Sequence, residues 1–258
     1  MTVVITGEGV TDYGWKDFGS NVWHEGSAAV LLKRVVSEYT KEDVELAFVD
    51  KNELKKENRP KKFQRHITNL EGRGIPCFFF LNLVKEKYKE TKVLPVFYTD
   101  ADKERKIDRK TESGCKKLLE ERYNQIENAA LNAGYDCIPM VPVKMIENWM
   151  MGDGKAIQKV FGKIPKGLPA KPELVWGTED DSNSDYPKNL LDRLFKSVNN
   201  GIEVKMQREV FAEIAEKIDL KTERKTCYIS FDSFCRKIEK YFEGSSHKID
   251  RIKQIFVY

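Results

Sequence analysis

The stretch VLPVFYTDAD, residues 93–102, decides the fold class, because an apolar run leads directly into two aspartates. A continuous apolar run of this length is typical of a strand buried on both faces of a sheet. The runs TVVIT (2–6), VELAFVD (44–50) and DCIPMVPV (136–143) are similar, and each ends near a charged residue or a Gly/Pro break. The sequence therefore predicts four buried strands.

Segments with helical spacing lie between these strands. Residues 26–39 have an amphipathic pattern, residues 74–90 begin with a proline-bearing turn, and residues 113–134 carry an apolar stripe that ends at Gly134. Strands that alternate with helices predict a parallel sheet with right-handed crossovers. We therefore expect an α/β, Rossmann-like fold with a mostly parallel four-stranded sheet flanked by helices.

The texture of the sequence changes after about residue 155. Residues 161–189 are rich in proline, glycine and short polar residues, which predicts irregular structure. Residues 187–216 and 229–243 have helical patterns, the first with Pro187 near its start. We predict a metal-binding domain over residues 1–155, followed over 156–258 by an irregular linker and a helical C-terminal extension.

Composition narrows the cellular setting. No segment approaches the roughly 18 apolar residues of a membrane span, and no basic patch precedes an apolar core at the N-terminus, so we expect neither a membrane partner nor a signal peptide. The five cysteines are odd in number and form no CxxC pair, which argues against a disulfide framework and a zinc ribbon. A reducing cytoplasm is the expected location.

Two basic runs raise the question of a nucleic-acid partner. Residues 51–66 hold seven lysines and arginines against two glutamates, and residues 103–117 hold seven against three acidic residues. Such runs are the electrostatic footprint of proteins that bind a phosphate backbone. They are equally typical of solvated loops and helix faces, so charge alone leaves both interpretations open.

The two aspartates after the run at 93–98 are the first candidate site residues. Asp100 and Asp102 stand at i and i+2, which on an extended backbone directs both side chains to one side, about 7 Å apart. Two such carboxylates do not both stay ionised at a poorly solvated edge unless a cation lies between them. Oxygen ligands of this kind suit Mg²⁺ or Mn²⁺. The pattern therefore predicts a metal site.

Further carboxylates are expected at the same edge. Functional groups collect at the carboxyl ends of parallel strands, which places Glu8, directly after the first strand, beside the aspartate pair. Asp12 follows Glu8 by four residues, and Glu147 follows the last strand, off the apolar face of its segment. The alternative interpretation is that these acids cap helices and terminate strands. Glu71 and Arg73, in a glycine turn, are predicted either to contact substrate or to serve the turn.

Taken together, VVITGEGVTD and VFYTDADKE resemble the Toprim domain of topoisomerases, primases and the overcoming-lysogenisation-defect nucleases. The position of Asp12 resembles the nuclease branch. MIENWMMGD is similar to a segment of small Toprim-like families of unknown function, in which a PK helix start (Pro187-Lys188) and a late SF..F helix (Ser230, Phe231, Phe234) also recur. The resemblance covers most of the chain and is closest over residues 1–12 and 94–104.

The resemblance implies a Mg²⁺- or Mn²⁺-dependent nuclease that holds two ions and cleaves phosphodiester bonds in DNA or RNA, tRNA included. In that family Glu8 would be a metal ligand or general base, and Asp100 and Asp102 would bind metal. Asp12 and Glu147 would complete a second metal position.

The resemblance also implies partners. Toprim-like nucleases often act with an ABC-type or related AAA-type ATPase in defence against phage, and a homodimer is among the expected assemblies. A basic residue that assists the leaving group is expected, and the candidates are Lys144, Lys155 and Lys103. Two alternatives stay open: a non-catalytic, Toprim-shaped sensor that docks on the ATPase, and a dehalogenase-like phosphatase with Asp100 as its nucleophile.

Overall fold

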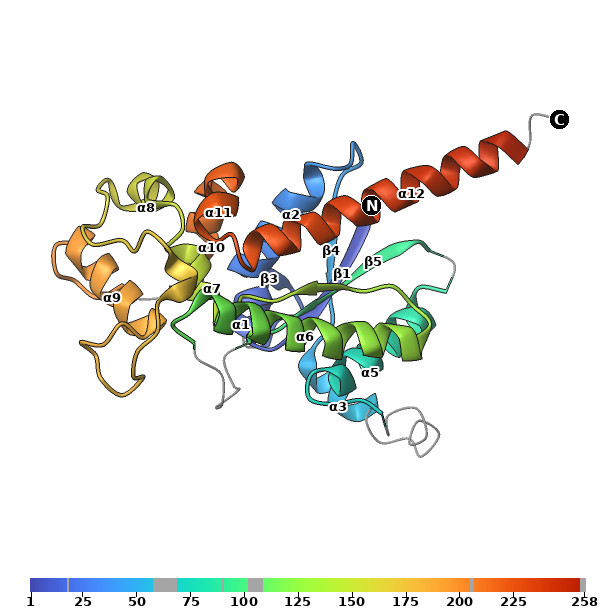
Figure 1. Cartoon of the computed structure of the whole chain (residues 1–258), viewed down its shortest axis with the longest axis horizontal. Coiled ribbons are helices and arrows are strands. Elements are labelled where there is room, and N and C mark those ends of the chain that lie inside the picture. The colour runs from blue at the N-terminus through green and yellow to red at the C-terminus, as the bar shows by residue number, and fades with distance from the viewer. Residues whose placement is uncertain (18, 58–68, 90, 102–108, 205–206, 256–258) are drawn as a thin grey trace.

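The computed structural model describes residues 1–17, 19–57, 69–89, 91–101, 109–204 and 207–255. Its centre is a four-stranded parallel sheet, which confirms the predicted α/β fold with a flanked parallel sheet (Figure 1). The strands lie in the order β4 (Glu45–Phe48), β1 (Thr2–Gly7), β5 (Val93–Tyr98) and β6 (Ile138–Met140).

The register of the two central strands sets the position of everything that follows them. β1 pairs with β5 from Thr2 opposite Val93 to Gly7 opposite Tyr98, so the two strands end side by side. The pairing continues one step further, because the backbone N–H of Glu8 donates to the carbonyl oxygen of Tyr98 at 3.0 Å. Side chains that follow β1 and β5 therefore share one edge of the sheet, which we call the rim.

Helices cover both faces of the sheet (Figure 1). One face packs on α5 (Gly74–Lys87), α6 (Glu112–Ala133) and α3 (Lys51–Glu57), and its core includes Val4 and Phe97. The predicted helix over 113–134 is confirmed as α6, which begins at a Thr111 cap and ends at Gly134 with φ 58°. The phenylalanine run within α5 is buried in this core, as its apolar sequence predicts.

The opposite face packs on α2 (Ser27–Ser37) and α12 (Phe231–Ile255), and α10 (Gln207–Lys217) packs on the outer side of α2. Its core includes Val3, Ile5 and Tyr98, which alternate along the strands with the residues of the first core. Both faces of β1 and β5 are therefore buried, which is why these strands are almost entirely apolar.

Three short elements near the N-terminus have no counterpart in the predicted set. Helix α1 (Val10–Tyr13) follows β1, and β2 (Gly14–Lys16) pairs antiparallel with β3 (Trp23–Glu25). Strands of three residues are too short for a period-2 pattern to identify them. Aromatic stacking stabilises this hairpin, with ring centroids of Trp15 and His24 at 5.4 Å.

The C-terminal part is helical apart from its linker. It comprises α7 (Ile146–Met150), α8 (Gly154–Phe161), the 3₁₀ turn η2 (Pro172–Leu174), α9 (Pro187–Val198), α10, α11 (Leu220–Thr226) and α12. The prediction of irregular structure over 161–189 is confirmed apart from η2 and the helix ends. The helical character predicted over 187–216 is confirmed as two helices, α9 and α10, with positive φ at Asn200 and Gly201 in the turn that follows α9.

One hydrophobic core joins the two parts of the chain. Trp149 of α7 packs on Phe231 and Phe234 of α12, with ring centroids at 5.1 Å and 6.2 Å. The same cluster includes Val3 and Ile5 of the sheet. The C-terminal helices thus pack on the sheet, and a domain boundary at residue 155 stays a prediction.

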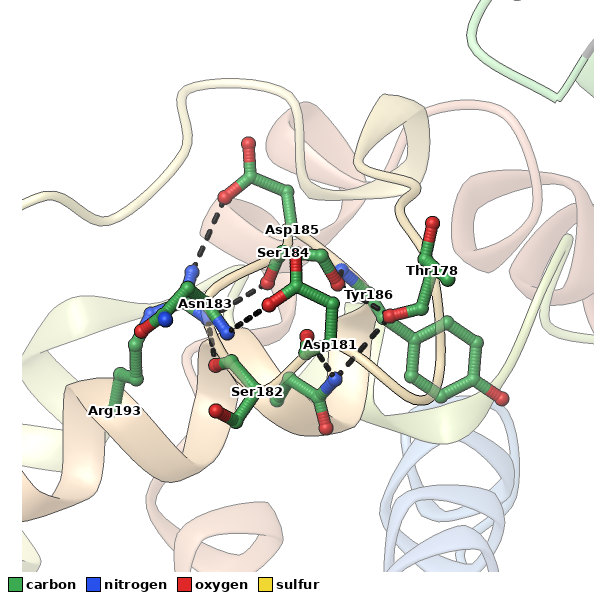
Figure 2. Close-up of polar contacts among 9 residues, drawn as sticks. Thr178, Asp181, Ser182, Asn183, Ser184, Asp185, Tyr186 and Arg193 are labelled. Carbon is green, nitrogen blue, oxygen red and sulfur yellow. Dashed lines mark hydrogen bonds and ion pairs between the residues drawn. The ribbon is translucent and has the colours of Figure 1, made fainter.

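The loop before α9 is held by side chains of that helix (Figure 2). The guanidinium of Arg193 donates to the carbonyl oxygens of Ser182 and Ser184, at 2.6 Å and 2.7 Å, and to Asp185 Oδ1 at 3.2 Å. The amide of Asn189 donates to three further carbonyls, those of Thr178, Glu179 and Asp181, at 3.4, 2.9 and 2.8 Å. These bonds fix residues 178–185 against the first turns of α9.

Membrane insertion has no candidate segment among the helices of the described ranges, because none combines the length and the apolar character that crossing a bilayer requires.

Candidate functional site

The turn after β1 brings an acid to the rim. Gly9 has φ +74°, a left-handed conformation that side chains rarely adopt. It accepts the backbone N–H of Asp12 at 2.8 Å, and a Cβ at Gly9 would lie only 2.3 Å from Asp12 Oδ2. The Glu-Gly pattern in the sequence therefore has a steric cause, because glycine alone leaves room for the Asp12 carboxylate.

A buried tyrosine links two of the predicted carboxylates. The hydroxyl oxygen of Tyr98, at the end of β5, lies 3.1 Å from Asp12 Oδ2 and 3.0 Å from Asp100 Oδ1. A phenol has one hydrogen and donates it to one acceptor at a time. Asp12 has a further donor, because the Thr11 hydroxyl lies 3.3 Å from its Oδ1. Asp12 and Asp100, predicted from their places after β1 and β5, do come together.

The ionisation of the site follows from burial. Burial raises the pKa of Asp12 to about 6, although the hydrogen bond from Tyr98 lowers it. Burial also raises the pKa of Glu147 to about 7, and the negative charge of Asp12 raises it further. The pKa of the Tyr98 hydroxyl is well above its usual value, again through burial and then through the charge of Asp100. Tyr98 therefore stays a hydrogen-bond donor near neutral pH.

The acids share a cleft with cationic side chains. Its volume is about 390 Å³, and it is lined by Thr11, Asp12, Asp100, Glu147, Lys188, Gln207, Arg208 and Phe211. The positive charge of Lys188 lowers the pKa of both Asp12 and Glu147. We call this the acidic cleft. It contains three of the predicted carboxylates and two basic residues that were not among the predicted assistants.

Glu8 lies at the rim but turns to the opposite side. Thr99 donates from Oγ1 to Glu8 Oε2 at 3.3 Å, and Arg73 forms an ion pair with the same oxygen. Because side chains alternate along an extended chain, Thr99 faces away from Tyr98 and Asp100. The Glu8 carboxylate therefore opens into a neighbouring cavity, with Arg73 as its counterion. Arg73 therefore does more than shape the glycine turn, because its side chain neutralises Glu8.

The predicted basic assistants do not line the acidic cleft within the described part of the chain. Lys144 is buried and donates from Nζ to the carbonyl oxygen of Val175 at 2.8 Å. Lys155 is exposed on α8. Lys103 and Asp102 lie outside the described residues, as do residues 58–66 of the first basic run and 103–108 of the second.

Glu147 is held in place by a polar network behind α7. Trp149 donates from Nε1 to Ser230 Oγ at 2.9 Å. The backbone N–H groups of Ile229 and Ser230 donate in turn to the buried carboxylate of Glu173, at 2.7 Å and 2.8 Å. The tryptophan of the IENWM segment and the serine of the SF..F segment therefore serve structure, because together they fix the helix that carries Glu147.

The donor set of the cleft has the chemistry that a hard divalent ion prefers. Asp12, Asp100 and Glu147 offer carboxylate oxygens, and the first two share a single phenolic hydrogen. No group of three or more His, Cys, Asp or Glu side chains within the described ranges is arranged closely enough to hold an ion as it stands.

Lys188 and Arg208 are the functional candidates that sequence reasoning missed. They begin α9 and α10, far along the chain from the strand ends, and only packing brings them to the cleft. The sole sequence signal was the PK helix start at Pro187-Lys188. Tyr98 was missed because a tyrosine within an apolar strand has the pattern of a core residue.

Comparison with known proteins gives a single kind of match. A family model described as Domain of unknown function (DUF4276) matches residues 26–239. The matched span includes Asp100, Glu147 and Lys188, whereas Glu8 and Asp12 precede it. No curated protein and no solved structure matches.

Proposed function

The chain belongs to the DUF4276 family of domains of unknown function, and we propose that this member is a Mg²⁺- or Mn²⁺-dependent nuclease that hydrolyses phosphodiester bonds. The observation that supports the proposal is the Tyr98 hydroxyl between Asp12 and Asp100. Carboxylates gathered at the ends of parallel strands, with cations opposite, are the equipment of metal-assisted phosphoryl chemistry.

Asp12, Asp100 and Glu147 would hold the metal, which would supply charge stabilisation to the phosphate oxygens and lower the pKa of a bound water. Lys188 and Arg208, on the opposite wall, would orient the substrate phosphate by charge-assisted hydrogen bonds.

The proton transfers fall to residues on both sides of the rim. In hydrolysis a water oxygen bonds to phosphorus while the bond from phosphorus to the leaving oxygen breaks. Because its carboxylate lies on the other side of the rim, Glu8 would accept the proton that the water loses through one relaying water molecule, once Arg73 turns from it to the substrate phosphate. Lys188 would donate a proton to the leaving oxygen, so that the products carry no uncompensated alkoxide.

The wider setting follows from the Toprim resemblance. We propose a cytoplasmic protein that acts on DNA or RNA, tRNA included, as the effector of a phage-defence system with an ABC-type ATPase. The cations at the cleft support a polyanionic substrate. These cations do not distinguish DNA from RNA, because a contact to the phosphate backbone does not read the edge of a base.

The test is cleavage of supercoiled plasmid, single-stranded DNA and bulk tRNA with Mg²⁺, with Mn²⁺ and with a chelator. We expect metal-dependent cutting that falls by about 10²-fold or more in Asp100→Asn, which loses a metal ligand, and in Glu8→Gln, which loses the general base. Glu213→Gln, at an exposed position of α10, is the matched control and should cut like the wild type.

Two outcomes would replace the proposal. If no nucleic acid is cut but p-nitrophenyl phosphate is hydrolysed, and Asp100→Asn abolishes that activity, the dehalogenase-like phosphatase takes its place. If every substrate stays intact, with and without an ABC-type ATPase from the same source, the chain is a sensor and the nuclease is excluded.

A further inference from the structure

A second cavity opens on the other side of the rim, next to Glu8. Its volume is about 380 Å³, within the usual range for small-molecule sites. We call it the Glu8 cavity. Its wall is apolar and is formed by Leu54 of α3, Ile75 and Pro76 of α5, and Phe97 of β5. Its polar residues are Glu8, Lys51, Arg73 and Thr99.

Among the charged groups that line the Glu8 cavity, positive charges outnumber negative ones. Lys51 and Arg73 are cationic, and Glu8 is the one acid among the lining residues of the described chain. An apolar wall beside two cations fits a ligand with an apolar, flat part and an anionic part. A hydrophobic pocket with a few convergent polar groups is also the usual form of a binding site.

Arg73 is held in place from behind. Gly72 has φ +48°, and a Cβ there would lie 2.7 Å from Gln125 Oε1 of α6. The same oxygen accepts the backbone N–H of Arg73 at 2.9 Å and Arg122 Nη1 at 3.2 Å. The turn is therefore fixed against α6, and the guanidinium is directed at Glu8 by a supported backbone. Such support is typical of a residue that binds an anion in a defined orientation.

We propose that the Glu8 cavity binds one nucleotide of the substrate strand, with its base against the apolar wall and its phosphate at Arg73 and Lys51. Guanidinium groups bind phosphate in bidentate geometry, and phosphate competes with a carboxylate for them. Phosphate binding therefore draws Arg73 away from Glu8, and the carboxylate, still bonded by Thr99, then accepts a proton more readily. The bound nucleotide would thus position the strand and also make Glu8 available as the general base.

The assignment of the ligand as substrate rests on the proposed nuclease, whereas nucleotide binding itself does not. The first experiment is therefore calorimetric titration with adenosine 5′-monophosphate, adenosine and inorganic phosphate, in a chelator and without metal. We expect one saturable site for the mononucleotide, with a Kd of about 1 mM or below, and binding at least about tenfold weaker for each half alone.

Two variants test the location. Ile75→Trp fills the cavity from a half-buried position, so the protein has room to fold, and it should abolish nucleotide binding. Lys51→Ala removes an exposed cation and should weaken binding about tenfold, the effect of one charge-assisted bond to phosphate. Lys225→Ala, exposed on α11, is the matched control. Unchanged circular dichroism and Tm establish that each variant is folded.

The outcomes separate this proposal from the nuclease. A wild type without saturable nucleotide binding, or a folded Ile75→Trp that binds like the wild type, overturns the Glu8 cavity as a nucleotide site. Nucleotide binding without any cleavage supports the site and overturns only the nuclease. A mononucleotide that a short single strand does not displace identifies free nucleotide as the ligand and overturns the assignment to the substrate strand.

Discussion

Glu147 imposes a pH-dependent penalty on folding that one substitution should remove. Burial raises its pKa from 4.5 to about 7 in the folded protein. The unfolded chain loses this proton near the lower value and the folded chain near the higher one. The penalty is thus absent below the lower pKa, grows between the two, and is complete above the higher pKa. At full size, the penalty lowers the free energy of unfolding by about 3 kcal/mol.

Glu147→Gln keeps the shape of the protonated acid and does not titrate. Near pH 4.5 the variant and the wild type should have similar free energies of unfolding. By about pH 8 the variant should be the more stable, by on the order of 3 kcal/mol. The assay is urea unfolding across this range in the presence of a chelator, with the midpoint and the m-value fitted at each pH.

The quantity to compare is the variant minus the wild type at each pH, because other groups also titrate over this range. Glu213→Gln serves as the control, since its side chain is exposed on α10. A difference for Glu147→Gln that stays constant with pH would refute the reasoning, because it would mean that Glu147 ionises in the fold as easily as in the unfolded chain.

Three further results are expected. Mg²⁺ at about a hundred times its Kd should raise the unfolding free energy of the wild type by about 2.7 kcal/mol at alkaline pH, as measured by urea unfolding. The unfolding free energy of Asp100→Asn should not change. Equal stabilisation of both proteins would show that Asp100 does not bind the metal. Gly9→Ala should lower stability and cleavage together, since its Cβ would meet Asp12, whereas Gly167→Ala, with φ +86° and no atom nearby, should keep cleavage intact. Arg193→Ala should lower the unfolding free energy by about 1–3 kcal/mol because two loop carbonyls lose their donor, and an unchanged urea midpoint would contradict this.

The fold could be predicted because its signals are local. The central strands are buried on both faces and mostly apolar, and that pattern is read directly from residues such as those of 93–98. The helix α6 is predicted by the apolar stripe of its sequence and by Gly134, which ends it. The hairpin of β2 and β3 could not be predicted, since three-residue strands carry no period, and the break between α9 and α10 depends on positive φ at Asn200 and Gly201.

The site was predictable only where it follows strand ends. Asp12 and Asp100 were placed by the rule that parallel strands end at one edge, and their proximity confirms it. Lys144 was one of three candidates for the basic assistant, but its side chain bonds to the carbonyl oxygen of Val175 instead. Lys188 enters the cleft through the packing of α9, a relation between distant segments that no local pattern contains.

The clamped loop of residues 178–185 determines how the wall of the acidic cleft can move. Asn189 and Arg193, one turn apart on α9, hold its carbonyl oxygens, so loop and helix are one rigid piece. Lys188 begins that helix and travels with it. The composition of the loop is that of a flexible linker, yet these bonds must break before it can separate from α9. As long as they hold, a strand that enters the cleft meets Lys188 on a helix that its own preceding loop braces.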